Sequence, residues 1–146
     1  MVWWLYACIA GHLVVGMLLA AMADAAVLDG YHRGIESAFW QGAAPGAARQ
    51  QQAWWLALFG PTVQAAAVWM AGLVWIGNRE RSAAAWIALL AGLILWAPQD
   101  MLISLRAGAV VHVWIDAIAL AMMLPPLAWL AFIDFNKDRH ADPIGR

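Results

Sequence analysis

The sequence has few of the residues that mark a disulfide-rich, nucleic-acid-binding or cofactor-binding protein. Its one cysteine, Cys8, cannot form an internal disulfide. Only 12% of the residues are charged, the net charge is −1 and the pI is near 6.4, so no basic surface for nucleic acid is expected. The chain carries no phosphate-binding loop or cofactor fingerprint. We therefore expect neither a nucleic-acid partner nor a cofactor.

Apolar residues dominate instead, at 65% of the chain with a mean hydropathy of +0.70, and 11 of the residues are tryptophan. A membrane-spanning helix needs about 20 predominantly apolar residues. Four such runs lie at about 3–28, 53–77, 82–105 and 109–133. They predict an all-α fold in which residues 1–146 form one polytopic membrane domain, an antiparallel bundle of four transmembrane helices.

The connections between the runs differ in length, and only the outer loop at 29–52 is long. Within this loop, the sequence predicts a short interfacial helix at 31–40. His32 and Glu36 would lie on one face of that helix and could form a lid over a pocket. Residues 134–146 are predicted to form a tail. Because residues 1–4 contain no Lys or Arg, the first run is expected to be a retained span and not a cleaved signal peptide.

Basic residues predict the orientation in the membrane. The side that carries both termini holds five of them and the opposite side three, which favours cytoplasmic termini in a bacterial inner (plasma) membrane. The five are Arg79, Arg81, Lys137, Arg139 and Arg146, and the three are Arg33, Arg49 and Arg106.

Asp100 and Asp116 lie inside two adjacent apolar runs, where an ionisable side chain costs roughly 2.5 to 3.5 kcal/mol on insertion scales and marks a functional site by default. Each is about eight residues from the turn between these runs, so both should lie roughly 8 to 12 Å below the outer surface. The sequence therefore predicts that the two carboxylates share one level of the membrane.

Other polar residues fall in the same outer half, which predicts an outward-facing polar pocket. They are Asp24, Gln64, Gln99 and His112, and the aromatic walls of the pocket are expected from Trp96 and Trp114. Aromatic walls with few polar groups are typical of a site for a small amphipathic or lipid-like molecule. Pro61 and Pro98 at similar depth either line this cavity through broken helices or are plain kinks.

Metal binding is an alternative, because the pairs His32–Glu36 and His112–Asp116 each have helical spacing and imidazole with carboxylate suits zinc, iron or manganese. A hydrogen-bonded pair is the simpler interpretation of each. Haem between His12 and His112 is not expected, because the two are separated by roughly 15 Å along the membrane normal.

Two resemblances bear on function. The run from Arg106 to Val111 resembles the Arg-x-Gly-x-Val-Val run of bacterial lipoprotein signal peptidases, which implies aspartate-based acid–base chemistry at Asp100 and Asp116. The Asn and Gly motifs around that family's catalytic aspartates are missing here, so the activity is not transferred. The four-span layout with Asp24 near the end of span one resembles the sterol-isomerase and sigma-2-receptor group, which implies a cavity for hydrophobic amines or sterols.

The remaining alternative is an accessory or structural subunit of a larger membrane complex, or a homo-oligomer, whose intramembrane polar groups pair with partner helices. Such a subunit should spread its polar groups over helix-contact faces, whereas here they gather in one half. Pocket binding is therefore the main hypothesis, with Asp100, Asp116 and His112 as the ionisable core and no catalytic residue assigned.

Overall fold

The computed structural model describes the backbone of residues 1–141 and the side chains of residues 1–137. Arg139 and Arg146, which the orientation prediction counted, lie outside the described side chains. The elements in chain order are α1 (Val2–Met22), the 3-10 turn η1 (Ala26–Leu28), α2 (Asp29–Trp40), α3 (Gly46–Glu80), α4 (Ala83–Arg106) and α5 (Val110–Ala141). Four of these helices, α1, α3, α4 and α5, are long and apolar enough to cross a membrane. The prediction of an all-α, four-span membrane protein with a short extra helix is confirmed.

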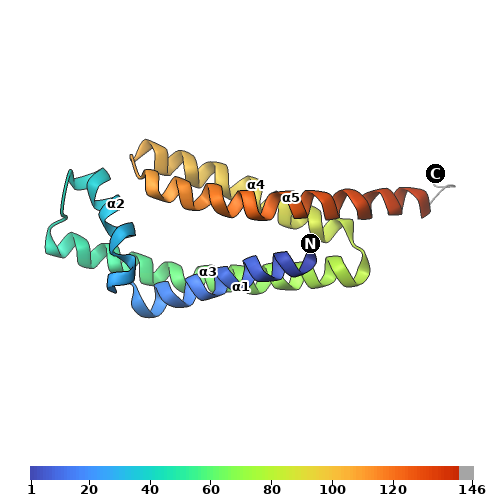
Figure 1. Cartoon of the computed structure of the whole chain (residues 1–146), viewed down its shortest axis with the longest axis horizontal. Helices are drawn as coiled ribbons and strands as arrows, with labels where there is room; N and C mark the ends of the chain where they lie inside the picture. The colour runs from blue at the N-terminus through green and yellow to red at the C-terminus, as the bar shows by residue number, and fades with distance from the viewer. Residues whose placement is uncertain (142–146) are drawn as a thin grey trace.

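The spans are arranged as two antiparallel hairpins, α1 with α3 and α4 with α5, and α2 lies at one end of both (Figure 1). We call this end the α2 end; it also holds the turn between α4 and α5. The opposite end, the turn end, holds the connection between α3 and α4, and both termini of the described chain point toward it. The two hairpins meet chiefly through α3 and α4 and through α1 and α5.

Small residues let α1 and α3 approach closely. A Cβ placed on Gly60 would lie 2.5 Å from the backbone nitrogen of Ala20, and one on Gly16 would lie 2.8 Å from the Gly60 carbonyl oxygen. Close backbone packing through glycine is how membrane helices gain dispersion energy, since lipid supplies no hydrophobic drive between them.

The apolar core shared by the hairpins is confined to the half nearest the turn end. Every span contributes to it from that half, through Leu5, Cys8, Ile9, Ala67, Val74, Trp86, Leu89, Leu93, Met123, Leu127 and Ala131. Toward the α2 end no residue joins this cluster within the described chain. The hairpins are therefore packed against each other at the turn end, and polar residues gather at the α2 end.

The turn end is held by a buried acid. Asp134 on α5 is 1% exposed, accepts a hydrogen bond from the Trp86 indole N–H at 2.9 Å, and pairs with the Arg81 guanidinium at 2.6 Å. Gly77 makes room for the Trp86 ring, because a Cβ there would lie 2.6 Å from it. Arg81 itself ends α3 in the left-handed conformation, with φ 56°.

The helices differ from the predicted spans chiefly at three boundaries. The second span begins earlier than predicted, because α3 starts at Gly46 and so includes the last part of the predicted outer loop at 29–52. The first span ends at Met22 and not near residue 28, because the chain turns through Ala23–Ala25 before η1 and α2. The last helix continues past residue 133 to Ala141, so Asp134, which the sequence placed in the tail, is helical and packed. A charge alone therefore did not mark the end of this helix.

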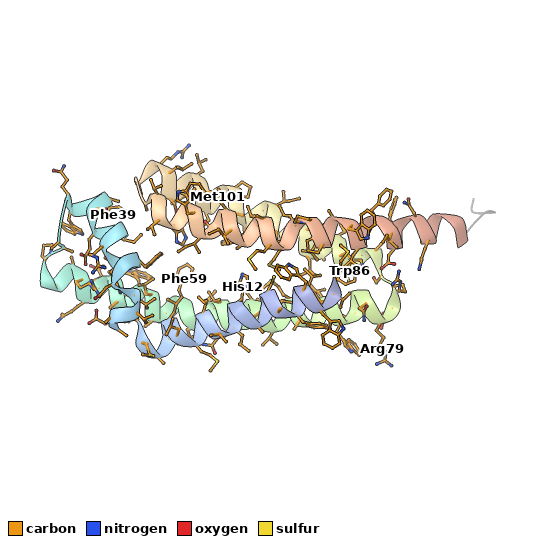
Figure 2. The ribbon with its side chains drawn as sticks, in the orientation of Figure 1. His12, Phe39, Phe59, Arg79, Trp86 and Met101 are labelled. Carbon is orange, nitrogen blue, oxygen red and sulfur yellow. The ribbon has the colours of Figure 1, made fainter. Side chains whose placement is uncertain are left out.

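Large apolar side chains cover the outside of all four spans. Trp3, Trp69, Leu95, Ile103, Trp114 and Phe132 are among those more than half exposed. Figure 2 shows side chains standing outward along the whole length of both hairpins. In a bilayer this surface faces lipid, which accounts for its exposure in the isolated chain.

Candidate functional site

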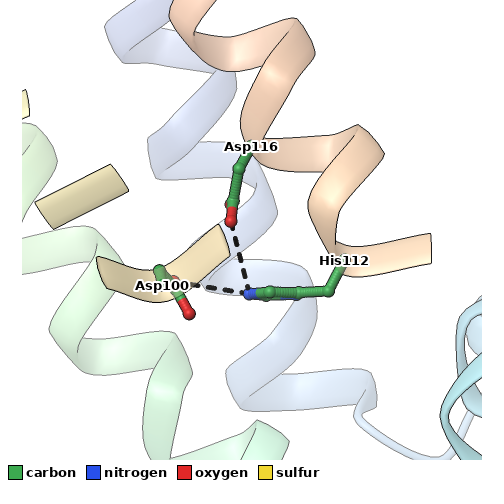
Figure 3. Close-up of side chains that lie close together, drawn as sticks. All are labelled: Asp100, His112 and Asp116. Atoms are coloured by element: carbon green, nitrogen blue, oxygen red, sulfur yellow. Dashed lines mark hydrogen bonds and ion pairs between the residues drawn. The ribbon is translucent and has the colours of Figure 1, made fainter. Parts of the chain in front are cut away.

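Three ionisable side chains from α4 and α5 meet near the α2 end. The Nε2 atom of His112 lies 3.4 Å from Oδ2 of Asp100 and 3.9 Å from Oδ2 of Asp116. Figure 3 shows both carboxylates directed at this one ring nitrogen. One ligand atom from each residue lies within 4.8 Å of the other two. We call Asp100, His112 and Asp116 the acid–histidine triad.

Local geometry explains why the triad forms. The tight turn at Ala107 and Gly108, where Gly108 has φ 75°, folds α5 back along α4 and sets Asp100 beside the start of α5. His112 and Asp116 are four residues apart, so they project from one face of α5. The structure thus places the two aspartates at one level, as the sequence predicted from their equal distance to the turn.

Tyr31 of α2 completes the surroundings of His112. Its hydroxyl oxygen lies 2.9 Å from His112 Nδ1. Because both carboxylates face Nε2, the neutral ring carries its proton there, and Nδ1 accepts a hydrogen bond from Tyr31. Burial first, and then the charges of Asp100 and Asp116, raise the pKa of Tyr31 to about 12. The phenol therefore stays protonated at neutral pH and remains a donor.

Asp116 is the most enclosed member of the triad. Its side chain is 3% exposed, and its Oδ2 atom has no hydrogen-bond partner. The side chains of Asp100 and His112 are each 27% exposed, so the triad has a buried side at Asp116 and an accessible side at Asp100. An unpartnered buried carboxylate oxygen costs about 1 to 3 kcal/mol or more, so this atom needs a chemical explanation.

The accessible side of the triad opens into a shallow recess between the hairpins. This recess has a volume of about 300 Å³ and is lined by Phe59, Trp96, Gln99, Asp100 and Ile103. Phe59 comes from α3 and the other four from α4, and Figure 2 shows Phe59 on the side of α3 that faces the second hairpin. The recess is mainly apolar, with Asp100 and Gln99 as its polar members.

Five of the predicted pocket residues therefore lie at or beside one site, namely the three members of the triad with Trp96 and Gln99, and the others lie elsewhere. Trp96 and Gln99 line the recess, where the Gln99 amide also donates to the Leu95 carbonyl at 2.6 Å. Trp114 does not, because it is 66% exposed and projects away from the triad. Gln64 is half-buried against Gly16 in the contact between α1 and α3.

Of the remaining predicted residues, Asp24 and Glu36 belong to a separate network around Arg49, and His32 makes other bonds nearby. The Arg49 guanidinium binds Asp24 at 3.2 Å, Asp29 at 3.2 Å and Glu36 at 3.0 Å. This network, the Arg49 anchor, ties α2 to the start of α3.

His32 reinforces the same attachment and has no ring nitrogen left for a metal. Its Nδ1 accepts from the Gln52 amide at 2.8 Å, and its Nε2 lies 2.7 Å from the Ala23 carbonyl, to which it donates. His32 and Glu36 thus fix α2 in place, and they do not converge with His112 and Asp116 on one set of ligands.

The two prolines are neighbours of the recess but do not line it. Pro98 immediately precedes Gln99 and Asp100, and Pro61 follows Gly60 at the contact with α1. This placement is compatible both with a broken helix beside the cavity and with a plain kink.

Sequence reasoning missed Tyr31 and the role of Arg49. A signal for Tyr31 was present, since Gly34 and Ala38 follow it at helical spacing and give α2 a narrow face for packing. A Cβ on Gly34 would lie 2.6 Å from Val111 of α5, so this face does lie against the second hairpin. Arg49 carried no comparable signal, because its three acids precede it by 13 to 25 positions and share no helical spacing with it.

No family model matches the chain, and no curated protein or solved structure shows significant similarity to it. The site is therefore interpreted from its own geometry.

Proposed function

We propose that this small membrane protein binds a lipid-like amphipathic molecule in the recess between α3 and α4. The apolar part of the ligand lies against Phe59, Trp96 and Ile103, and its polar end reaches Asp100. The observation that supports this most directly is the recess itself, which joins an apolar wall from two hairpins to a carboxylate of the triad.

The uneven core supports the same proposal. Because the hairpins share apolar packing only toward the turn end, a guest molecule at the α2 end displaces lipid and not core side chains. Phe59 is 56% exposed and Ile103 is 65% exposed, so their apolar surface is available to a ligand.

The polar members of the recess suggest the chemistry of the ligand's polar end. Asp100 offers carboxylate oxygens. The Gln99 amide donates one N–H to the Leu95 carbonyl and keeps its oxygen as an acceptor, beside its second N–H. Both groups therefore complement a donor. A hydroxyl or an ammonium group fits, and the aromatic ring of Trp96 adds a favourable surface for a cation.

The proposed membrane orientation places the α2 end outside and both termini in the cytoplasm of a bacterial plasma membrane. The sequence assigns five basic residues to the side of the termini and three to the side of the α2 end, and this excess supports the direction. The ligand then enters the recess from the outer leaflet.

Photoaffinity labelling in lipid nanodiscs tests the proposal. The probe is a long-chain alkyl alcohol that carries a diazirine near its hydroxyl, and the labelled positions are mapped by peptide mass spectrometry. We expect labels in α3 around Phe59 and in α4 around Trp96 and Ile103. Excess unlabelled alcohol should suppress them, and Asp100→Asn should reduce them roughly tenfold.

The matched control is Asp24→Asn, which removes another acid near the same end that is 71% exposed and lies in the Arg49 anchor. It should leave labelling unchanged. Labels spread evenly along all lipid-facing helices, without competition, would contradict specific binding in the recess.

A further inference from the structure

The acid–histidine triad has the arrangement of a metal site, because one potential ligand atom from each of its three residues lies near a common point. In a tetrahedral site with bonds of about 2.0 to 2.1 Å, neighbouring ligand atoms lie roughly 3.3 to 3.4 Å apart. The two measured separations from His112 Nε2 are 3.4 Å to Asp100 and 3.9 Å to Asp116. All three ligand atoms lie within 4.8 Å of one another, so coordination requires the side chains to close by on the order of 1 Å at the widest pair.

The charge of the triad also favours a bound cation. Within the described side chains, neither Asp100 nor Asp116 forms an ion pair with Lys or Arg, and His112 is their only charge partner. One imidazolium can balance one carboxylate, whereas a divalent cation balances both. In a low-dielectric membrane interior two unbalanced carboxylates are costly, so this balance matters.

Asp116 provides an independent observation. Its side chain is 3% exposed, and its unpartnered Oδ2 atom is directed at the same nitrogen as Asp100. A helix that only needed a buried residue at this position could use an apolar one. A metal ion between the three ligand atoms gives the Asp116 oxygen a partner.

We propose that Asp100, His112 and Asp116 bind a divalent transition metal ion, Zn²⁺ or Mn²⁺, through one oxygen of each carboxylate and His112 Nε2. Imidazole with carboxylates is the donor set that suits these ions. The imidazole proton then resides on Nδ1 and is donated to the Tyr31 oxygen at 2.9 Å. Metal-bound histidines usually make such a hydrogen bond from the other ring nitrogen.

Three protein ligands leave at least one coordination position for water or another oxygen, as in sites that act on a bound molecule. Asp100 lines the recess, so this position lies on the recess side of the triad. The metal site goes beyond the proposed amphipathic ligand and does not depend on it. A hydroxyl group at the end of such a ligand can bind the ion, while an ammonium group would compete with it for Asp100.

The test uses the metal alone. The full chain is purified in detergent through a tag without histidine, stripped with a chelator and titrated with Co²⁺, which reports its ligands through visible absorption. We expect saturation at one equivalent, with the intensity typical of four- or five-coordinate nitrogen and oxygen ligands, and displacement by Zn²⁺. A titration of the unmodified chain without a saturable absorption change would overturn the proposal.

Variants then identify the ligands. His112→Ala and Asp116→Asn should each weaken Co²⁺ affinity at least tenfold, and Tyr31→Phe should weaken it about tenfold through the second ring nitrogen. His12→Ala is the matched control, because His12 on α1 lies outside the triad and bonds to the Cys8 carbonyl of its own helix. Binding that survives His112→Ala but falls with His12→Ala would place the metal elsewhere.

The two proposals fail separately. Loss of metal binding with intact photolabelling leaves the recess as a ligand site without an ion, and the reverse result leaves the metal site alone. Size-exclusion profiles that match the unmodified chain ensure that each variant is folded, and the Co²⁺ spectrum of the unmodified chain does not depend on any variant.

Discussion

Tyr31 and His112 are 81 positions apart in the sequence, yet the Tyr31 hydroxyl lies 2.9 Å from Nδ1 of the imidazole. This contact joins α2, which the Arg49 anchor attaches to the first hairpin, to α5 of the second. The short helix therefore connects the two hairpins at the end where they share no apolar core.

Replacing Tyr31 with phenylalanine should loosen α2 without unfolding the bundle. The change removes one hydrogen bond, worth about 1 kcal/mol. We expect amide exchange in α2 to accelerate roughly fivefold while the core half of the spans is unaffected, as measured by hydrogen–deuterium exchange in nanodiscs. The chain's other tyrosine, Tyr6, packs near Trp3 on α1, and Tyr6→Phe should leave exchange in α2 unchanged.

Removing Arg49 should release α2 more completely. Arg49→Gln leaves Glu36, whose side chain is 8% exposed, without its ion-pair partner, at a cost of about 3 kcal/mol. Limited proteolysis should then cut within 29–45 faster than it does in the unmodified chain. Arg33→Gln is the control, since Arg33 is 70% exposed and only 4.0 Å from Asp29 at its closest. Equal cleavage of the two variants would argue against the Arg49 anchor.

The contact between α1 and α3 should not tolerate a methyl group at Gly60. An alanine Cβ there would lie 2.5 Å from the backbone nitrogen of Ala20, so the helices must separate, at a cost of about 1 to 3 kcal/mol. We expect Gly60→Ala to lower the thermal unfolding midpoint in detergent. Gly72→Ala, also on α3, meets nothing within 4 Å and should leave the midpoint unchanged or raise it.

The buried Asp134 should make the turn end sensitive to Arg81. Arg81→Gln leaves the carboxylate with only the Trp86 N–H, and we expect a loss of about 2 kcal/mol. This is less than the 3 to 5 kcal/mol of a fully buried pair because Arg81 is 48% exposed and partly screened by solvent. Arg79→Gln removes only a contact of 5.0 Å over the Trp75 ring and should cost under about 1 kcal/mol. Equal shifts in the unfolding midpoint would contradict the role assigned to Asp134.

Sequence periodicity and symmetry about a turn were enough to predict the part of the site that is local. Asp100 and Asp116 are equally distant from the bend at Gly108, and His112 precedes Asp116 by one helical turn, so their meeting follows from helix geometry. Trp114 shows the limit of assigning residues by depth alone. It lies two residues from Asp116, about 200° around the helix, and therefore projects to the opposite side.

Long-range pairing could not be predicted in this way. Asp134 looked like the start of a polar tail. It is buried because the indole N–H of Trp86, 48 residues away, donates a hydrogen bond to its carboxylate. Asp24 looked like a member of the outer pocket and Glu36 like part of its lid, but the bend after Met22 and the course of α2 bring both to Arg49. Hydropathy gives the depth of such residues in the membrane, while the direction of a loop depends on contacts that no single segment contains.

The confinement of the apolar core to the turn end has a mechanical consequence. The hairpins are packed together at the turn end, whereas at the α2 end they are linked through α2 and the contact between Tyr31 and His112. A thinner or more tightly stretched leaflet around the α2 end should change the separation of the hairpins there before it disturbs Leu5, Trp86 or Leu127. The lipid composition of the membrane would then set how widely the triad is open to it.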